Sequence, residues 1–312
     1  MTGRTGKRVT VLMGGWSAER AVSLNSGAAA VAALREAGYT AEAIDVARDP
    51  LCFLEQLRGS RPDVVFNALH GRFGEDGRIQ GLLDILALPY THSGALASAM
   101  AMDKPTAKAV FAAAGIPVAE HILVDAEAFA DPDHEPMARP YVIKPPNEGS
   151  SVAVHVVTEG SNALAQLRQD WPFDGPAMVE QFIPGRELTV AVMGEGDDVR
   201  SLAVTEITTQ GGFYDYDAKY VAGGSVHVLP ADLDAATTAA CLDLSARAHR
   251  ALGCRGVSRA DLRFDGETVY LLEVNTQPGM TATSLVPEQA AHMGLPFPAL
   301  CAWMVEAATC DG

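Results

Sequence analysis

The stretch that decides the fold reads Arg259-Ala-Asp261-Leu-Arg-Phe-Asp-Gly-Glu-Thr-Val-Tyr-Leu-Leu-Glu273-Val-Asn275-Thr-Gln-Pro-Gly279. Its polarity alternates as in two neighbouring β-strands, with an Asp-Gly turn signal between them. Asp261, Glu273 and Asn275 carry oxygen atoms at positions where a strand interior is normally apolar. Carboxylate and amide oxygens are the ligands that Mg²⁺ prefers, usually shared with the phosphates of a substrate. The stretch therefore predicts a hairpin that holds a metal site.

The register of this hairpin decides whether the oxygen atoms can meet. Side chains alternate between faces along a strand, so Arg259 shares a face with Asp261, and Glu273 with Asn275. A two-residue Asp-Gly loop would leave these two pairs on opposite faces of the hairpin. A three-residue loop, or a single β-bulge, brings all four side chains onto one face. The metal interpretation therefore excludes the simple tight hairpin, and its alternative is a surface hairpin whose charges face water.

The composition is that of an ordinary globular protein. Of 312 residues, 48% are hydrophobic and 20% charged, enough for two or three domains with cores of their own. The net charge of −16 argues against a nucleic acid or an anionic membrane as partner. No apolar run reaches membrane-spanning length, and Val9–Met13 is too short for the core of a signal peptide. We therefore expect a cytoplasmic protein whose scattered cysteines form neither disulfides nor a zinc site.

The first 95 residues alternate between strand and helix patterns, which predicts a parallel sheet covered by helices. The strands are expected at residues 8–13, 39–46, 63–67 and 89–91, and the helices at 19–37, 50–58 and 79–87. The rest of the chain mixes the two types less regularly. Its helices are expected at residues 103–114, 161–170, 234–252 and 298–308, and strands before the hairpin at 141–144, 152–157, 177–182 and 187–193.

Two glycine-containing loops follow strands of this first region. The turn at Gly14-Gly15 precedes a helix, where free backbone N–H groups attract anions. Glu19, in the first turn of that helix, either complements the helix dipole or holds a substrate ammonium group. The loop at 67–77 follows the third strand, at the sheet edge where α/β proteins bind ligands. Its His70 is either a polar ligand contact or a structural histidine.

Two further loops have compositions that favour ligand binding. The loop at 145–151 is rich in Gly and Ser and follows Lys144, so it is able to enclose phosphates, although it lacks the Walker A pattern. The alternative there is an ordinary hairpin loop. The segment from Thr208 to Pro230 has no periodicity and many aromatic and acidic residues. A segment of this kind is expected to be a lid that closes over a substrate.

Read together, these motifs resemble those of the D-alanine:D-alanine ligases of the ATP-grasp superfamily, over roughly residues 8–308. They occur in the family's order along the chain: Gly14-Gly15-x-Ser17-x-Glu19-Arg20, His70-Gly71-x-x-Gly74-Glu75-Asp76-Gly77, Met102-Asp103-Lys104, Lys144-Pro145, Glu148-Gly149-Ser150-Ser151, Phe213-Tyr214-Asp215-Tyr216-x-x-Lys219-Tyr220, Arg259-x-Asp261 and Glu273-x-Asn275-Thr276-x-Pro278-Gly279. Several spaced motifs in order are far more specific than any single one.

The resemblance implies a mixed fold of α/β and α+β type. A Rossmann-like pre-ATP-grasp domain would occupy residues 1–100. A two-lobed ATP-grasp domain would follow, with a central lobe at 101–185 and a C-terminal lobe at 186–312 that carries the lid at 208–230. ATP would lie between the two lobes.

The resemblance also implies roles for individual residues. Two Mg²⁺ or Mn²⁺ ions would be held by Asp261, Glu273 and Asn275. The positions that match nucleotide contacts are Lys104, Lys144, Glu180, Ile183, Glu187 and the lid residue Lys219. The positions that match catalytic residues are Glu19 with Ser150 and Tyr220 at the first D-alanine ammonium, Arg259 and the Gly279 N–H at an oxyanion, and Ser284. Substrate contacts would come from His70, Ser284 and Leu285, the last two at the second D-alanine carboxylate.

The implied reaction joins two D-alanine molecules at the expense of ATP, in peptidoglycan precursor synthesis, by a homodimer. A carboxylate is a poor acyl donor because its leaving group would be oxide, and phosphorylation supplies a good one. Relatives that prefer hydroxy acids tend to carry phenylalanine at the position of Tyr220, so tyrosine favours dipeptide formation. D-lactate or D-serine as acceptor remains open.

Two readings from other functional classes also remain. The Gly14-Gly15 turn and Asp45, at the end of the second expected strand, allow a nicotinamide oxidoreductase, but the G-x-G-x-x-G pattern of such enzymes is missing. A non-catalytic nucleotide-binding module is the other alternative. Such a module would be expected to have lost Arg259, Asp261 or Glu273, and all three are present.

Overall fold

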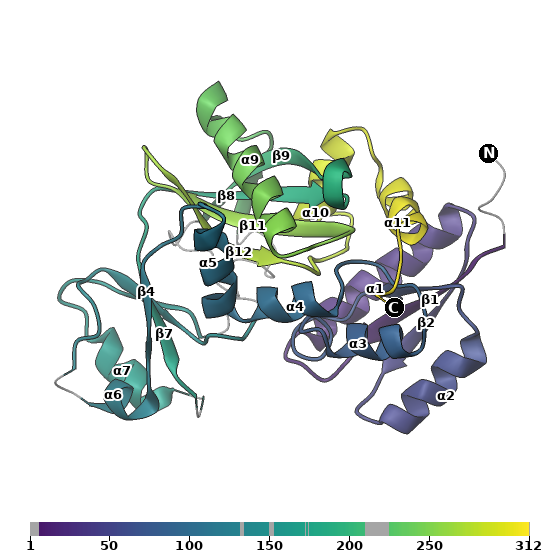
Figure 1. The fold of residues 1–312 in the computed structure, drawn as a ribbon, viewed down its shortest axis with the longest axis horizontal. Helices are drawn as coiled ribbons and strands as arrows, with labels where there is room; N and C mark the ends of the chain where they lie inside the picture. The colour runs from purple at the N-terminus through teal and green to yellow at the C-terminus, as the bar shows by residue number, and fades with distance from the viewer. Residues whose placement is uncertain are drawn as a thin grey trace.

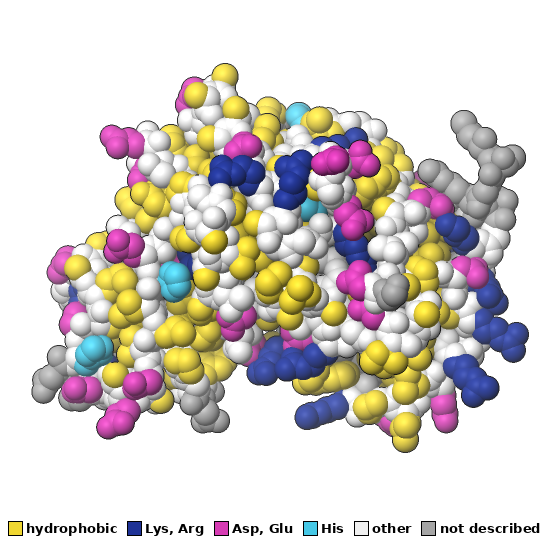
Figure 2. All heavy atoms as spheres, viewed as in Figure 1, with side chains coloured by type: hydrophobic (Ala, Val, Ile, Leu, Met, Phe, Trp, Pro, Cys, Tyr) yellow, Lys and Arg dark blue, Asp and Glu magenta, His cyan; other side chains and the backbone are white. Residues whose placement is uncertain are grey.

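The computed structural model describes residues 6–131, 134–149, 153–171, 173, 175–209 and 225–311. Within these ranges the strands form three sheets, of three, four and five strands, and the five-stranded sheet lies between the other two (Figure 1). None of the helices in the same ranges has the length and apolar character needed to span a membrane. Figure 2 shows acidic side chains spread over the visible face, with basic ones more numerous over the N-terminal region.

The N-terminal region is a parallel sheet in the order β2-β1-β3. Its strands are β1 (Arg8–Gly14), β2 (Thr40–Val46) and β3 (Val64–Asn67), and its helices α1 (Arg20–Glu36), α2 (Pro50–Ser60) and α3 (Arg78–Ile85). Val11 of β1 packs in one core with Leu34 of α1, while the adjacent Leu12 packs in another with Phe53 and Leu57 of α2. Both faces of the sheet are therefore covered, as the alternation of strands and helices predicts.

The strand expected at 89–91 is reduced to a bridge at Tyr90, which pairs with Val65. Backbone hydrogen bonds join Val65 to Pro89 and Thr91, at 2.8 and 3.0 Å, and the ladder then ends because Thr91 Oγ1 accepts the Asn67 N–H at 3.0 Å. The short strand predicted there is a single bridge, which adds a parallel neighbour to β3 at the edge of the sheet.

The central sheet is antiparallel, in the order β4-β7-β5-β6. Its strands are β4 (His121–Val124), β5 (Tyr141–Lys144), β6 (His155–Val157) and β7 (Ala177–Gln181), covered by α6 (Ala126–Ala130) and α7 (Ala163–Asp170). Two helices precede it, α4 (Ala95–Met102) and α5 (Lys104–Ala113). Asp103 caps α5 by accepting the Thr106 N–H at 3.0 Å, and Pro105 lies in its first turn, as the sequence predicts.

The C-terminal sheet is antiparallel, in the order β10-β9-β8-β11-β12. Its strands are β8 (Arg186–Met193), β9 (Arg200–Thr209), β10 (Ser225–Val228), β11 (Val257–Phe264) and β12 (Val269–Asn275). The helices of this part are a short 3-10 turn (Gly196–Asp198), α9 (Ala235–Ala251), α10 (Leu285–His292) and α11 (Phe297–Glu306). Successive residues of β8 face opposite cores: Val190 packs with α9, and Ala191 packs with α10 and α11.

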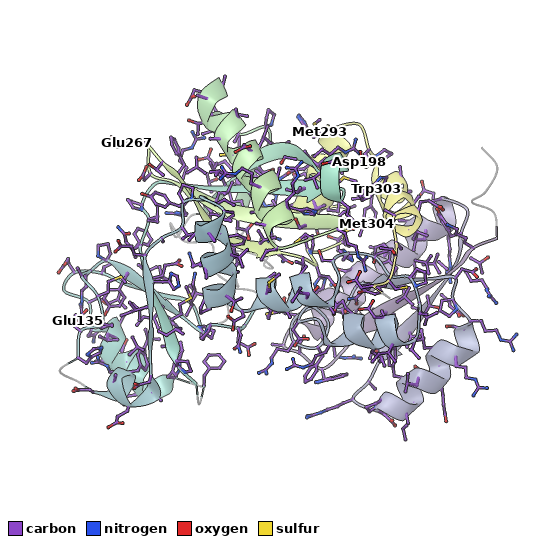
Figure 3. All side chains as sticks on the ribbon, viewed as in Figure 1. Glu135, Asp198, Glu267, Met293, Trp303 and Met304 are labelled. Carbon is purple, nitrogen blue, oxygen red and sulfur yellow. The ribbon has the colours of Figure 1, made fainter. Side chains whose placement is uncertain are left out.

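The last helix returns to the N-terminal region, where α11 lies beside α1 (Figure 1). Met304 of α11 is buried in the core that it shares with α1, and Trp303, labelled beside it in Figure 3, packs against that core. Tyr39 Oη donates to Glu306 at 2.6 Å at the end of this contact. The chain thereby closes on itself, which fixes the C-terminal sheet relative to the N-terminal one.

The β11–β12 hairpin contains the bulge that the metal interpretation requires. Phe264 pairs with Val269 across a loop at 265–268, and the register then shifts so that Asp261 pairs with Glu273 and Arg259 with Asn275. The extra residue on β12 lies at position 272. The tight two-residue hairpin is therefore excluded, and the prediction of one polar face is confirmed.

Candidate functional site

A cavity of about 660 Å³ lies where the N-terminal loops meet the C-terminal sheet. Its wall includes the start of α1, the loop after β3, the start of α5, the polar face of the hairpin and the loop that leads into α10. The predicted site residues among its lining are Glu19, His70, Lys104, Arg259, Glu273, Asn275, Gly279, Ser284 and Leu285. Residues from four distant stretches of sequence are thus brought together as predicted.

A second, smaller cavity of about 100 Å³ lies between the central sheet and the hairpin. The predicted residues among its lining are Lys104, Lys144, Glu180, Ile183, Glu187, Asp261 and Glu273. Val142, Phe182 and Leu272 add apolar walls. A pocket with apolar walls and lysines at one end can bind a flat base and the phosphates attached to it.

The two cavities meet at residues that line both: Lys104, Glu148, Gly149 and Glu273. Lys104 Nζ donates to the Glu148 carbonyl oxygen at 2.6 Å and lies 3.7 Å from Glu273 Oε2. An ammonium group is therefore held at the junction, beside a carboxylate of the hairpin. A group that belongs to a ligand in one cavity can approach a ligand in the other at this junction.

The polar face of the hairpin is organised by hydrogen bonds. Arg259 donates from Nε and Nη2 to the two oxygens of Asp261, at 2.8 and 2.6 Å. Thr189 Oγ1 also donates to Asp261 Oδ1, at 2.8 Å. The Gln277 N–H donates to Asn275 Oδ1 at 2.8 Å, which orients the amide of Asn275 in the wall of the larger cavity.

Two carboxylates and one amide oxygen on one face form a donor set that fits Mg²⁺ rather than zinc. In the described ranges, no group of three or more His, Cys, Asp and Glu residues is placed to hold a metal ion. Asp261, Glu273 and Asn275 supply three side-chain donors, whereas Mg²⁺ takes about six ligands. An ion bound there would need oxygen ligands from a phosphate or water, which is how Mg²⁺ is usually held.

A buried ion cluster closes the inner end of the smaller cavity. Glu180 Oε1 lies 2.9 Å from Lys144 Nζ, and Oε2 lies 2.7 Å from Lys108 Nζ. All three side chains are buried. Burial by itself would raise the pKa of Glu180, but the two neighbouring ammonium groups hold that pKa below its ordinary value. No role for Lys108 was predicted from the sequence, although it lies four residues after Lys104 on one face of α5.

Replacing Glu180 with glutamine is expected to lower the free energy of unfolding by about 3 kcal/mol, because two buried ammonium groups lose their shared counter-ion. Urea unfolding at pH 7 measures the change. A folded-state pKa below the value of about 4.3 in the unfolded chain stabilises the fold above that pH. This contribution is lost as the pH falls through the folded-state pKa, so the difference between wild type and variant should shrink in acid.

The matched control for this prediction is Glu127→Gln, which changes an exposed acid of α6 in the same lobe. It should leave the unfolding free energy within about 0.5 kcal/mol of wild type. A Glu180→Gln protein as stable as this control would show that the cluster contributes nothing to the fold.

The N-terminal wall of the larger cavity is held by buried polar contacts. His70 Nδ1 lies 3.0 Å from Glu75 Oε1, and its Nε2 lies 3.1 Å from Ser26 Oγ. Both ring nitrogens therefore have protein partners, and a substrate contact at His70 stays a prediction. Glu19 is buried beside this pair, and a Cβ at Gly71 would lie 2.7 Å from its Oε2. Glycine is required at 71 by this close approach and by its φ of +73°.

The loop between β12 and α10 is tied to the N-terminal region by Gln277. Asn67 Nδ2 donates to Gln277 Oε1 at 2.6 Å, and Gln277 Nε2 donates to the Leu69 carbonyl oxygen. Further along the loop, Thr281 N–H donates to Ser284 Oγ at 3.1 Å. Gln277 thus positions Gly279 and Ser284 against the N-terminal wall. Sequence reasoning missed this role, because nothing local marks a glutamine for a contact with a residue so far away in the chain.

Some predicted residues lie outside the described ranges: Ser150, Lys219 and Tyr220, together with most of the expected lid at 208–230. Gly149 is the last described residue before Ser150, and it lies close to Glu19, with which Ser150 is predicted to interact. A Cβ at Gly149 would lie 3.3 Å from Glu19 Oε2. The roles of these three residues stay predictions.

Comparisons with known proteins agree over the whole chain. The model of the D-ala D-ala ligase C-terminus matches residues 110–306, and that of the D-ala D-ala ligase N-terminus matches residues 53–93. The D-alanine–D-alanine ligase of Rhodospirillum rubrum is 64% identical over 306 residues, covering 98% of this chain and 99% of the relative. That of Acidiphilium cryptum is 58% identical over 306 residues, covering 97% and 99%.

Solved structures lead to the same family. The D-alanine–D-alanine ligase from Bacillus anthracis complexed with ATP superposes with a TM-score of 0.79 at 27% identity, covering 97% of each chain. A second structure of the ligase from Bacillus anthracis gives a TM-score of 0.82 at 29% identity over the same shares. These likenesses confirm the mixed α/β fold with an ATP-grasp arrangement. The chain belongs to the D-alanine–D-alanine ligase family.

Proposed function

We propose that this protein joins two D-alanine molecules into D-alanyl-D-alanine, with conversion of ATP to ADP and phosphate, in the synthesis of peptidoglycan precursors. The observation that carries the proposal is the junction of two cavities at Lys104 and Glu273. The smaller cavity suits a nucleotide and the larger one suits small zwitterions. Their meeting point is where a phosphoryl group would pass from one ligand to the other.

The nucleotide would lie in the smaller cavity. Its base would pack against Phe182, Ile183 and Leu272, and the carboxylate of Glu187 would bind the ribose hydroxyls. Arg263 Nη1 donates to Glu187 Oε2 at 3.1 Å and so holds that carboxylate in place. Lys144, itself held by Glu180, would contact the phosphates.

The γ-phosphate would point to the junction, where phosphoryl transfer to the first D-alanine carboxylate forms an acyl phosphate. Lys104 would stabilise the negative charge of the transferring group. Asp261, Glu273 and Asn275 would hold Mg²⁺ or Mn²⁺, which when bound neutralises the charge of the phosphates. The buried carboxylate of Glu19, which lies close to Gly149 at the junction, would hold the ammonium group of this first D-alanine.

The amine of the second D-alanine would then attack the acyl phosphate and expel phosphate. The tetrahedral oxyanion that forms would accept hydrogen bonds from Arg259 and from the Gly279 N–H, both of which line the cavity. Ser284 and Leu285 would bind the carboxylate of this acceptor. Closure of the cavity would keep water from hydrolysing the acyl phosphate.

The domain bounds, the oligomeric state and the cellular location are part of the same proposal. We place the N-terminal domain at 1–100, the central lobe at 101–185 and the C-terminal lobe at 186–312. One exception lies in the packing of α5, whose Ala107 and Phe111 belong to the core of the C-terminal sheet. The active protein would be a homodimer in the cytoplasm, where ATP is supplied.

Phosphate release tests the function directly. The protein, ATP and Mg²⁺ are incubated with D-alanine, with L-alanine or with no amino acid, and dipeptide is followed by mass spectrometry. Release should depend on D-alanine and equal the dipeptide formed. Equal release in all three incubations would contradict the ligase assignment, and mixed products with added D-serine or D-lactate would show a broader acceptor range.

A further inference from the structure

His227 lines the larger cavity from β10, although no motif in the sequence singles it out. Its Nδ1 lies 2.9 Å from Oε2 of Glu288 on α10. A carboxylate only accepts hydrogen bonds, so Nδ1 carries the hydrogen of this contact. In the part of the chain that the structure describes, Nδ1 is the ring nitrogen with a protein partner. Because His227 lines the cavity, Nε2 can meet a ligand there.

The Glu288 contact places His227 near one end of that cavity. The Glu288 N–H donates to the Ser284 carbonyl oxygen at 2.9 Å, so the two residues are one helical turn apart on the same side of α10. Ser284 and Leu285 both line the cavity. The ring of His227 therefore lies about one turn from the two residues proposed to bind the acceptor's carboxylate.

The exposure of the side chains along β10 also distinguishes His227 from its neighbours. Val226 and Val228 are 62% and 38% exposed, whereas His227 on the opposite side of the strand is half-buried against the cavity. A strand on a protein surface normally turns its valines inward and its polar residues to water. The reversed pattern is explained by a requirement for the side chain of His227 in the larger cavity.

We propose that His227 is a specificity-determining residue for the amino acid that accepts the acyl group. With Nδ1 held by Glu288, its Nε2–H donates a hydrogen bond to the carboxylate of that acceptor. The ring then lies between two carboxylates, one from the protein and one from the substrate. This inference rests on the proposed ligase function, and it adds a contact on the strand that follows the expected lid.

Two isosteric variants distinguish a substrate contact at Nε2 from a purely structural contact between Nδ1 and Glu288. Asparagine at 227 puts its amide nitrogen near the position of Nδ1, and glutamine puts it near the position of Nε2. The D-alanine concentration that half-saturates dipeptide formation should rise about tenfold in His227→Asn, since a hydrogen bond to a charged group is lost. It should stay within about threefold of wild type in His227→Gln. The ATP concentration for half-saturation should change by less than about twofold in both.

The opposite order, with His227→Asn normal and His227→Gln impaired, would show that only the tie to Glu288 matters and would overturn the proposal. Unchanged values in both variants would overturn it as well. Val228→Ala is the matched control, because it changes the other side of the same strand, and it should behave as wild type. Glu288→Gln keeps an acceptor for Nδ1–H but removes the charge, so it should raise the D-alanine concentration by about threefold.

The two proposals can fail separately. A wild-type protein that forms no dipeptide from D-alanine would contradict the ligase function itself. An active wild type whose His227 variants match the Val228→Ala control would leave the function intact and remove His227 from the acceptor site.

Discussion

Glu273→Gln is expected to lower kcat by at least about a hundredfold while nucleotide binding changes little, since a lost carboxylate removes several kcal/mol of charge stabilisation at the phosphates. Glu273 lines both cavities and lies opposite Asp261 in the bulged hairpin. Glutamine has the same shape but no charge, so the loss should appear in turnover rather than in folding. Steady-state kinetics and calorimetric titration with a non-hydrolysable ATP analogue measure the two quantities.

The same hairpin offers a matched control. Glu267 lies at its exposed tip, where Figure 3 labels it, and it lines neither cavity. Glu267→Gln removes one negative charge from the same hairpin and should leave kcat unchanged. Wild-type turnover in Glu273→Gln would take this residue out of the metal site. An equal loss in the two variants would point to a general effect of charge.

Arg259→Lys is the second change with a large expected effect. Lysine keeps the positive charge but cannot make the paired contacts to both oxygens of Asp261. It also leaves a developing oxyanion with a displaced donor, for which a loss of about a hundredfold in kcat is typical. The ATP concentration for half-saturation should change less, because Arg259 lines only the larger cavity.

Arg247→Lys is the control for the loss of a guanidinium group. Arg247 forms an exposed ion pair with Asp243 within α9 and lines neither cavity. The Arg247→Lys protein should retain full activity. If Arg259→Lys also keeps full activity, the oxyanion role of Arg259 is wrong and its contact with Asp261 is dispensable.

The polar hairpin could be predicted in detail because local pattern and geometry agree there. Period-2 alternation fixed which residues of each strand share a face, and chemistry demanded that Asp261 and Glu273 meet. Only a bulge or an odd loop satisfies both conditions. The actual position of the bulge at Leu272 could not be predicted, because several neighbouring apolar residues would serve equally well as the extra one.

Other parts of the fold carried too little local signal. The helix α4 is almost entirely alanine, methionine and leucine, so it has no polar face to reveal its period. The five-residue helix α6 is too short for any period to appear. Both are defined by what packs on them, which is information from elsewhere in the chain.

The supporting residues of the site were the least predictable. Gln277 acts through Asn67, which is 210 positions away, and Lys108 through Glu180. Such pairs are visible only once distant segments are brought together. By contrast, residues such as Ser284 and Leu285 entered the sequence interpretation through family resemblance, and the structure adds that they line the same cavity as Glu19 and Arg259.

The bulge in β12 also bears on how this enzyme can vary. Leu272 is one residue more than the ladder needs, since Leu271 already pairs with Leu262 and Glu273 with Asp261. A deletion at this point would leave an unbroken alternation, with Leu271 and Val274 toward the core and Glu273 toward the cavity. Because Leu272 lines the smaller cavity, its gain or loss reshapes the wall of that cavity. Here an insertion or deletion can change the shape of the smaller cavity without moving Asp261 and Glu273 off their common face.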